Sequence, residues 1–254
     1  MKLLLVNDDG WQHEGIQTLA RVLSEKHEVV LCAPMGERSA SSQSINVRSP
    51  LLVQKVTAHD LPCTVYYVDG SPADCTRMAL TEICPDADLV VTGINAGYNV
   101  SVDTRYSGTV GCAMEALLQG KPALAVSAGG HPPYLYLPAA RIAEKVVSMH
   151  LAEKMPAGIM LSLNVPSIPE NEIQGIRVAP LHMDTLSPIG HHLSVSENEN
   201  RNWYLTRFNH PFTEEGDVDT AYLSKGYAII TPLSMDMTAY GALDELKSAL
   251  LQFE

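Results

Sequence analysis

The sequence has few positive charges. Lys and Arg together supply 17 of its 254 residues against 29 Asp and Glu, which gives a formal net charge of −12 at pH 7. A nucleic-acid polymer is usually bound by a basic face, so we expect no partner of that kind. A small anionic substrate stays compatible with this charge, provided that a cation other than the protein's own side chains receives it.

Cysteine pairs and long apolar runs are also missing. The five cysteines are odd in number and form no CxxC pair, a pattern that favours reduced, structural thiols. No apolar run approaches the roughly 18 residues of a membrane span, and residues 3–6 are too short an apolar stretch for a signal peptide. The composition therefore predicts a folded cytoplasmic protein without a membrane segment.

Several catalytic signatures are absent. The chain contains no GxGxxG, GxxxxGK[ST], GxSxG or HExxH, so a dinucleotide fold, a P-loop, an esterase-type serine and a metalloprotease helix are not indicated. His191 and His192 could bind a metal, but a histidine pair in a polar loop is more often solvated surface. His13 and His131 lie near predicted strand ends.

Alternating apolar patterns predict strands and helices in turn. Residues 3–6 read as a strand buried on both faces, residues 15–24 as an amphipathic helix and residues 27–34 as a second strand, which makes a βαβ unit. The same alternation continues to about residue 166. It includes strands at 64–68, 88–95, 122–130 and 159–166, a helix capped by Ser71 with Pro72 at its first position, and helices over 107–120 and 138–154. We therefore expect a doubly wound, Rossmann-like α/β fold with a mostly parallel sheet.

The pattern changes after about residue 166, although residues 176–181 still read as a plausible strand. Residues 182–220 are polar and irregular apart from a short strand-like stretch at 203–208, and a good strand (227–233) and a terminal helix follow. We expect a core over 1–181, and an extension over 182–254 that contains a hairpin arm used in oligomerisation, a return strand and the C-terminal helix.

Small oxygen-bearing side chains follow several predicted strands. Asp8 and Asp9 end the first strand, Ser39 follows the second and Asn95 ends the strand at 88–95. Ligands bind outside the carboxyl ends of parallel strands, so these side chains are predicted to share a site.

Asp8 and Asp9 are adjacent carboxylates at the end of a buried strand. A turn with one helix-capping aspartate explains one of them, but not both. Two carboxylates about 4–5 Å apart repel by several kcal/mol unless one is protonated or a cation lies between them, and Mg²⁺ or Mn²⁺ prefers such oxygen ligands.

The predicted helix over 107–120 begins with Ser107, Gly108 and Thr109. Backbone N–H groups and two hydroxyls at a helix N-terminus form a ready anion site. On its own this segment is equally an ordinary Ser/Thr cap. Next to a divalent cation, the simplest ligand for this segment is a phosphate group.

Two other acidic-site families fit less well. A response-regulator receiver needs a phosphoacceptor aspartate at the end of DADLVV, where this chain has Thr92 and Gly93, and more than 80 residues separate this segment from Asp8. A haloacid-dehalogenase-type phosphatase needs the spacing DxD, and Asp8 and Asp9 are adjacent. Neither pattern is met.

An ordered series of motifs resembles the SurE family (survival protein E) of metal-dependent 5′/3′-nucleotidases. It covers most of the chain, as NDDG, APMGERSASSQSIN, DGSPADC, GINAGYNVSVDTRYSGTVGCAMEA, LSLNVP and GYAIITPLSMDMTA. The resemblance implies that Asp8, Asp9, Ser39 and Asn95 bind the metal. It also implies that Asn95 and the segment Ser107, Gly108 and Thr109 face the phosphate.

The resemblance also implies the activity. Members hydrolyse nucleoside monophosphates, and some of them short polyphosphate, with Mg²⁺ or Mn²⁺, and they form homodimers or homotetramers through an exchanged C-terminal arm. The opposing interpretation is a non-catalytic sensor that binds a metal and a nucleotide in the same pocket. Three positions depart from the family pattern: Glu14, Ser101 (usually glycine) and Ser234 (often histidine).

Overall fold

A computed structural model describes residues 1–183, 189–198, 201–208, 213 and 215–250 of the chain. The strands of its main sheet are β1 (Lys2–Val6), β2 (Glu28–Pro34), β3 (Val53–Val56), β4 (Thr64–Val68), β5 (Leu89–Ala96), β6 (Ala123–Gly129), β7 (Ile159–Pro166), β8 (Ile176–Val178) and β11 (Ala228–Ser234). The α-helices are α1 (Glu14–Ser24), α2 (Pro72–Met78), α3 (Gly108–Leu118), α4 (Tyr136–Ser148), α5 (Asp219–Leu223) and α6 (Leu243–Leu250).

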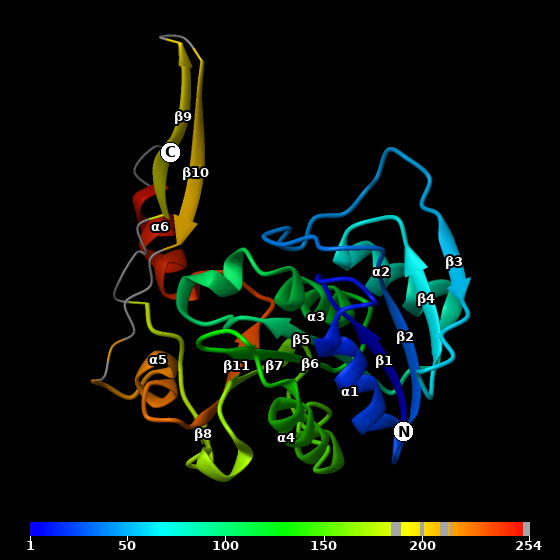
Figure 1. The fold of residues 1–254 in the computed structure, drawn as a ribbon. Coiled ribbons are helices and arrows are strands. Elements are labelled where there is room, and N and C mark those ends of the chain that lie inside the picture. The colour runs from blue at the N-terminus through cyan, green and yellow to red at the C-terminus, as the bar shows by residue number, and fades with distance from the viewer. Residues whose placement is uncertain (184–188, 199–200, 209–212, 214, 251–254) are drawn as a thin grey trace.

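The main sheet has the order β3-β4-β2-β1-β5-β6-β7-β11-β8 (Figure 1). All neighbours from β4 through β2, β1, β5 and β6 to β7 are parallel, whereas β3 and β11 run antiparallel to β4 and β7. From β1 the chain builds the sheet outward through β2 and then returns to β5 on the other side. The predicted doubly wound α/β fold is confirmed, and its topological switch point lies between β1 and β5.

Each face of the sheet has its own core. Leu3 and Leu5 of β1 pack in a cluster with residues of α1 and α4, whereas Leu4 and Val6 pack with residues of α2 and α3. Successive side chains of a strand point to opposite faces, so an unbroken apolar run fits a strand covered on both sides. The four apolar residues before Asn7 are therefore fully explained by the double layer of helices.

Most of the observed helix and strand boundaries agree with those predicted from the sequence. Ser71 caps α2 by accepting a hydrogen bond from the Asp74 N–H, and Pro72 is the first helical residue, as predicted. The predicted helix over 138–154 instead begins at Tyr136 and ends at Ser148. The predicted strand over 176–181 ends at Val178, and the exposed edge strand β3 was not predicted.

All five cysteines are unpaired. Four of them are buried, and burial raises the pKa of Cys32 to about 12. A thiol that stays protonated is a poor nucleophile and a poor metal ligand. This agrees with the prediction of reduced, structural thiols.

The predicted arm contains a two-stranded antiparallel sheet, formed by β9 (Ile189–Asn198) and β10 (Arg201–Phe208). This hairpin projects away from the main sheet (Figure 1). His191 and His192 therefore lie in a strand, not in a loop. β11, which follows the arm, lies inside the main sheet between β7 and β8.

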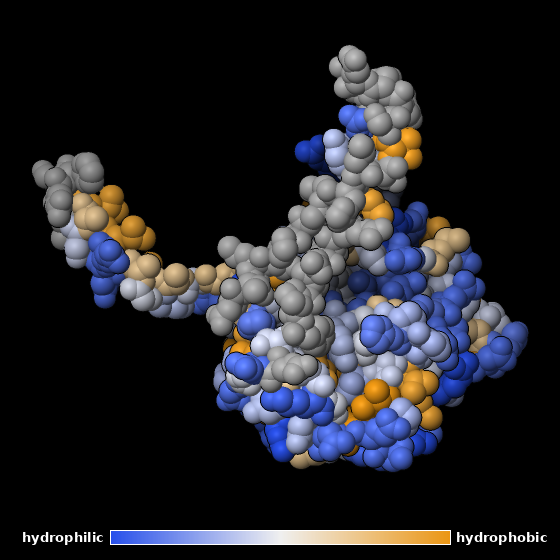
Figure 2. All heavy atoms as spheres, turned by 60° about the vertical axis from the view of Figure 1, so that its left-hand side comes forward, coloured by the Kyte–Doolittle hydropathy of each residue, from blue (hydrophilic) through white to orange (hydrophobic). Residues whose placement is uncertain are grey.

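Exposed apolar side chains gather on both extensions of the molecule. In the hairpin they are Val195, Trp203, Tyr204 and Leu205, and on α6 they are Leu243, Leu246 and Leu250. Figure 2 shows two projections from the globular body with apolar side chains on both. Within the described ranges, no helix is long and apolar enough to span a membrane.

Candidate active site

A pocket of about 440 Å³ opens at the switch point, where β1 and β5 end side by side. It brings together five of the seven predicted site residues, and also His13, and the segments that follow β1, β2 and β5 form its walls. Its lining consists of Asp8, Asp9, His13, Glu37, Ser39, Ala40, Asn95, Ala96, Tyr98, Asn99, Asp103, Tyr106 and Ser107.

Asp8 is the deepest acid of the pocket, with 4% of its surface exposed. The Thr109 hydroxyl donates a hydrogen bond of 2.5 Å to Asp8 Oδ1. The pKa of Asp8 is raised to about 6, mainly by burial and also by the charge of the neighbouring Asp9, while the hydrogen bond from Thr109 acts in the opposite direction. The hydrogen bond from Thr109 therefore fixes the orientation of the Asp8 carboxylate, whereas burial and the charge of Asp9 disfavour its ionised form.

Asp9 lies beside Asp8, and only 11% of its side chain is exposed. Burial raises the pKa of Asp9 to about 6, with a contribution from the negative charge of Glu37. Among the described residues no hydrogen-bond donor reaches the buried Asp9 Oδ2, and His13 Nδ1 lies 3.7 Å from it. A buried carboxylate oxygen without a donor is costly unless a cation satisfies it.

The turn after β1 aims both carboxylates into the pocket. The Asn7 side chain closes this turn, because its Nδ2 donates to the Gly10 carbonyl at 2.9 Å and its Oδ1 accepts from the Gly10 N–H at 3.1 Å. Gly10 has a φ of +98°, and a Cβ there would lie 3.0 Å from Gly36 Cα. Only glycine fits this turn without strain.

Asn95 and Ser39 contribute amide and hydroxyl oxygens from neighbouring strand ends. Asn95 Nδ2 donates to the Gly97 carbonyl at 2.9 Å, which leaves Oδ1 as the atom able to bind a cation. Ser39 is exposed, and its hydroxyl donates to Glu37 Oε1 at 2.7 Å. Its loop follows β2 and is held against β1, since the Arg38 N–H donates to the Asp8 carbonyl at 2.7 Å.

The donor set fits a hard divalent cation. Two carboxylates, an amide oxygen and a hydroxyl around an oxygen-lined pocket are the ligands that Mg²⁺ and Mn²⁺ prefer. The part of the chain that the structure describes contains no group of three or more His, Cys, Asp or Glu side chains arranged to hold a metal. A site of this mixed type does not require such a group, because its remaining ligands are neutral oxygens.

Helix α3 begins at the pocket. Ser107 lines the pocket and caps the helix, because its Oγ accepts a hydrogen bond of 3.1 Å from the Val110 N–H. Gly108 follows directly, and a Cβ at this position would lie 2.7 Å from both Asp8 Oδ2 and Ser41 Oγ. The first turn of α3 thus approaches the Asp8 carboxylate as closely as a backbone without a side chain allows.

Thr109 has a different place from the one expected. Its side chain is fully buried, its hydroxyl is used by Asp8, and its carbonyl accepts a hydrogen bond of 2.8 Å from the Thr92 hydroxyl. Neither Gly108 nor Thr109 is among the pocket-lining residues. The geometry gives Thr109 the task of orienting Asp8.

The segment between β5 and α3, here called the pocket loop (residues 97–107), supplies several lining residues that were not singled out from the sequence. Tyr98 and Asp103 belong to it, and Glu37 comes from the loop after β2. Asn99 anchors the pocket loop to the sheet, because its N–H donates to Asn164 Oδ1 at 2.8 Å and its Nδ2 donates to Ser127 Oγ at 2.9 Å. The polar Ser127 and Asn164 inside apolar strand segments were the available signal.

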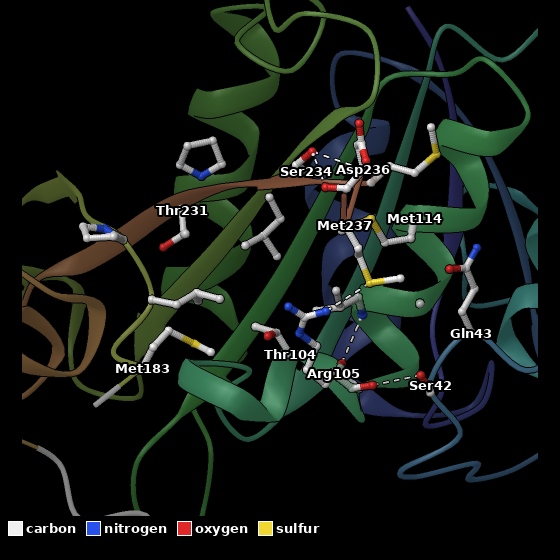
Figure 3. A pocket seen from close by; sticks show the side chains of 18 of the residues that line it. Ser42, Gln43, Thr104, Arg105, Met114, Met183, Thr231, Ser234, Asp236 and Met237 are labelled. Carbon is white, nitrogen blue, oxygen red and sulfur yellow. Dashed lines mark hydrogen bonds between the residues drawn. The ribbon is translucent and has the colours of Figure 1, made fainter. Parts of the chain in front are cut away.

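A larger pocket of about 750 Å³ lies next to the first, and Ser107 lines both. Figure 3 shows its methionine-rich wall, in which Arg105 Nη1 donates to Met237 Sδ and the Ser42 hydroxyl donates to the Arg105 carbonyl. Its lining contains no pair of neighbouring carboxylates. The smaller pocket therefore remains the candidate for chemistry.

Comparison with known proteins agrees with the motifs. A family model described as "Survival protein SurE" matches residues 3–187. The chain belongs to the SurE family. A "5′-nucleotidase SurE" of Clostridium beijerinckii is 35% identical over 249 residues, which cover 97% of this chain and 98% of the relative. The protein of the same description from a Marinomonas species is 37% identical over 251 residues, covering 97% and 96% of the two chains.

The SurE fold is also found among solved structures. The crystal structure of the SurE protein from Aquifex aeolicus superimposes with a TM-score of 0.83 at 30% sequence identity, covering 98% of this chain and 99% of the other.

Proposed function

We propose that this SurE-family chain is a metal-dependent nucleotidase, which hydrolyses nucleoside 5′- and 3′-monophosphates to nucleoside and phosphate. The observation that carries the proposal is the meeting of two buried carboxylates, both with a pKa raised to about 6, with the N-terminus of α3 in one pocket. The relatives described as 5′-nucleotidases support the 5′ activity. Short polyphosphate is a further candidate substrate.

Asp8, Asp9, Ser39 and Asn95 would hold the cation, which we propose to be Mg²⁺ or Mn²⁺. Bound there, a divalent cation supplies the positive charge that this acidic chain lacks, polarises phosphoryl oxygens and lowers the pKa of water. Thr109 fixes the direction of the Asp8 carboxylate through its hydrogen bond. One of the two aspartates orients or deprotonates the attacking water.

The N-terminus of α3 would receive the phosphoryl group. Backbone N–H groups of its first turn carry partial positive charge and lie beside Asp8, so they would stabilise the additional negative charge of the transition state. Gly108 is required for this approach because any side chain would collide with Asp8. Ser107, which lines the pocket, orders this first turn as its cap.

We also propose that the chain forms a homodimer or homotetramer through its C-terminal arm. The support is the exposed apolar surface of the hairpin, where Val195 is directly opposite Trp203 and both are about half exposed, at 53% and 54%. Exposed apolar clusters on a projecting element are typical of subunit contacts. The free, buried cysteines suit the cytoplasm, where we expect the protein to work.

The test is phosphate release from a panel of nucleoside 5′- and 3′-monophosphates and from short polyphosphate, each with EDTA, Mg²⁺ or Mn²⁺. The proposal predicts release that requires a metal and is lost in Asp8→Asn. No release with either metal, combined with thermal stabilisation by nucleotide, would contradict it. That result would favour a sensor that binds without hydrolysis.

A further inference from the structure

A single buried carboxylate, that of Asp219, receives hydrogen bonds from three separate backbone positions. Its Oδ2 accepts from the Ser101 N–H at 2.8 Å, and its Oδ1 accepts at 2.8 Å from the His182 N–H and at 2.8 Å from the Thr220 N–H. Only 1% of Asp219 is exposed. Charge-assisted bonds of this length inside a protein fix the groups that make them.

Ser101 is the centre of the pocket loop. It follows Asn99 by two residues and begins the 3-10 turn Ser101–Arg105, beyond which Tyr106 and Ser107 line the pocket. Its φ is +52°, a left-handed conformation that is unfavourable for a residue with a side chain. The Ser101 hydroxyl also donates to the His182 carbonyl at 2.5 Å. Contacts with another part of the chain therefore hold this unfavourable turn in place.

That other part of the chain is the base of the arm. His182 precedes the hairpin β9–β10 and Asp219 follows it, so the same carboxylate joins the two ends of the arm to each other and to the pocket loop. Ser101 and Asp219 are 118 residues apart in the sequence. The pocket loop thus has two anchors, Asn99 on the sheet side and Ser101 on the arm side.

We propose that Asp219 is a positioning residue for the active site. It does not line the pocket, and among the described residues its carboxylate bonds to no candidate metal ligand; it acts by holding the Ser101 backbone, and with it the path of the pocket loop into the first turn of α3. The arm base thereby becomes part of the scaffold of the site. This proposal depends on the proposed function only where enzymatic activity is the quantity measured.

Asp219→Asn tests the proposal. The amide keeps the size of the side chain, but its NH₂ group cannot accept a hydrogen bond, so at least one of the three N–H donors loses its partner. With Mn²⁺ and a nucleoside 5′-monophosphate, we expect kcat/KM to fall by at least about tenfold, as small misplacements of catalytic groups do. We also expect faster amide hydrogen exchange over residues 97–107, without faster exchange in β1.

Thr231→Val is the matched control. The Thr231 hydroxyl donates to the Ala179 carbonyl at 2.7 Å and is buried, so this variant also loses one internal hydrogen bond in the same region. It leaves Asp219 and its three donors intact. We expect wild-type kcat/KM and wild-type exchange over 97–107, even where its Tm falls as far as that of Asp219→Asn. Equal kcat/KM in the two variants would overturn the proposal.

Ser101→Gly keeps the question answerable where Asp219→Asn does not fold. Glycine suits the positive φ and keeps the N–H that Asp219 accepts, so only the hydroxyl bond to His182 is lost. Since the bond from the Ser101 N–H to Asp219 stays in place, we expect the Tm, kcat/KM and exchange over 97–107 to be close to those of the wild type. A fall in kcat/KM of tenfold or more with faster exchange over 97–107 would show that the Ser101 hydroxyl, and not Asp219, holds the loop, and would overturn the proposal.

Hydrogen exchange separates this proposal from the proposed function. If the wild type releases no phosphate with any metal, the proposed function fails and the exchange measurement alone decides about Asp219. Faster exchange over 97–107 in Asp219→Asn, but not in Thr231→Val, then supports the positioning role. Identical exchange in the two variants contradicts it.

Discussion

At the scale of single residues, the burial of Asp8 and Asp9 makes the stability of the protein depend on pH. Both carboxylates have a pKa raised to about 6 in the folded chain, against about 3.9 when unfolded. Between these values the folded state keeps protons that the unfolded state has already lost. The metal-free protein therefore loses stability as pH rises from about 4 to about 6, and stays less stable above that window.

Asp8→Asn should remove the part of this loss that belongs to Asp8. The amide oxygen can still accept from Thr109, while the unfavourable charge is gone. In EDTA at pH 7.5 we expect the free energy of unfolding to rise by about 1–3 kcal/mol, and the gain to vanish near pH 4. Urea unfolding at both pH values measures it. Asp60→Asn, which removes an exposed carboxylate, should show no such gain, and a less stable Asp8→Asn at pH 7.5 would contradict the account.

Gly108→Ala tests the close approach of α3 to Asp8. The added methyl group would lie 2.7 Å from Asp8 Oδ2, so the carboxylate or the helix must shift. We expect phosphate release to fall by at least about tenfold, while Mn²⁺ binding weakens. Gly241→Ala is the control, because its Cβ meets no atom within 4 Å. Full activity in Gly108→Ala would show that this approach is not needed.

At the scale of elements, patterns of short range were predictable from the sequence and contacts of long range were not. The apolar spacing of Ile16, Leu19 and Leu23 and the cap at Ser71 predicted α1 and the start of α2, because these signals lie within one or two turns. The exposed four-residue strand β3 carries no alternation that distinguishes it from a loop. β3 is a strand because it pairs with β4, and this pairing cannot be read from the sequence of β3 alone.

The candidate site follows the same division. Asp8, Asp9, Ser39 and Asn95 could be grouped in advance, because parallel strands end at one edge of the sheet whatever their distance in sequence. No comparable rule predicts the contact of Asp219 with Ser101, since nothing in the sequence of either segment identifies the other as its partner. The place of Thr109 was also not predictable, since a threonine at a helix start is an ordinary feature of caps until Asp8 is seen beside it.

The hairpin β9–β10 carries the prediction at this scale. Trp203 and Leu205 alternate along β10 and share one face, and Val195 lies opposite Trp203. We expect the double variant Val195→Glu/Leu205→Glu to have at most half the molar mass of the wild type, measured by light scattering after gel filtration. Met149→Glu, also at an exposed apolar residue, should leave the mass unchanged. An unchanged mass in the double variant would exclude this face as the subunit contact.

At the scale of the whole molecule, the metal binding that we propose should stabilise the folded state of this acidic chain, whose net charge is −12. A ligand that binds only the folded state at 100 times its Kd stabilises it by about 2.7 kcal/mol. We expect Mn²⁺ at that ratio to raise the Tm, EDTA to reverse the rise, and a nucleoside monophosphate to add to it only when Mn²⁺ is present. Asp8→Asn should show neither rise. A nucleotide effect in EDTA equal to that in Mn²⁺ would contradict a shared site.

The most direct test of the central claim joins binding and turnover in the same samples. Mn²⁺ binding by titration calorimetry and phosphate release from a nucleoside 5′-monophosphate are measured for the wild type and for Asp8→Asn at pH 7.5. The account predicts one Mn²⁺ bound per chain and metal-dependent release by the wild type, with release reduced by at least roughly 10²-fold in the variant. Release that persists in Asp8→Asn or in EDTA would show that the two carboxylates at the end of β1 do not hold a catalytic cation.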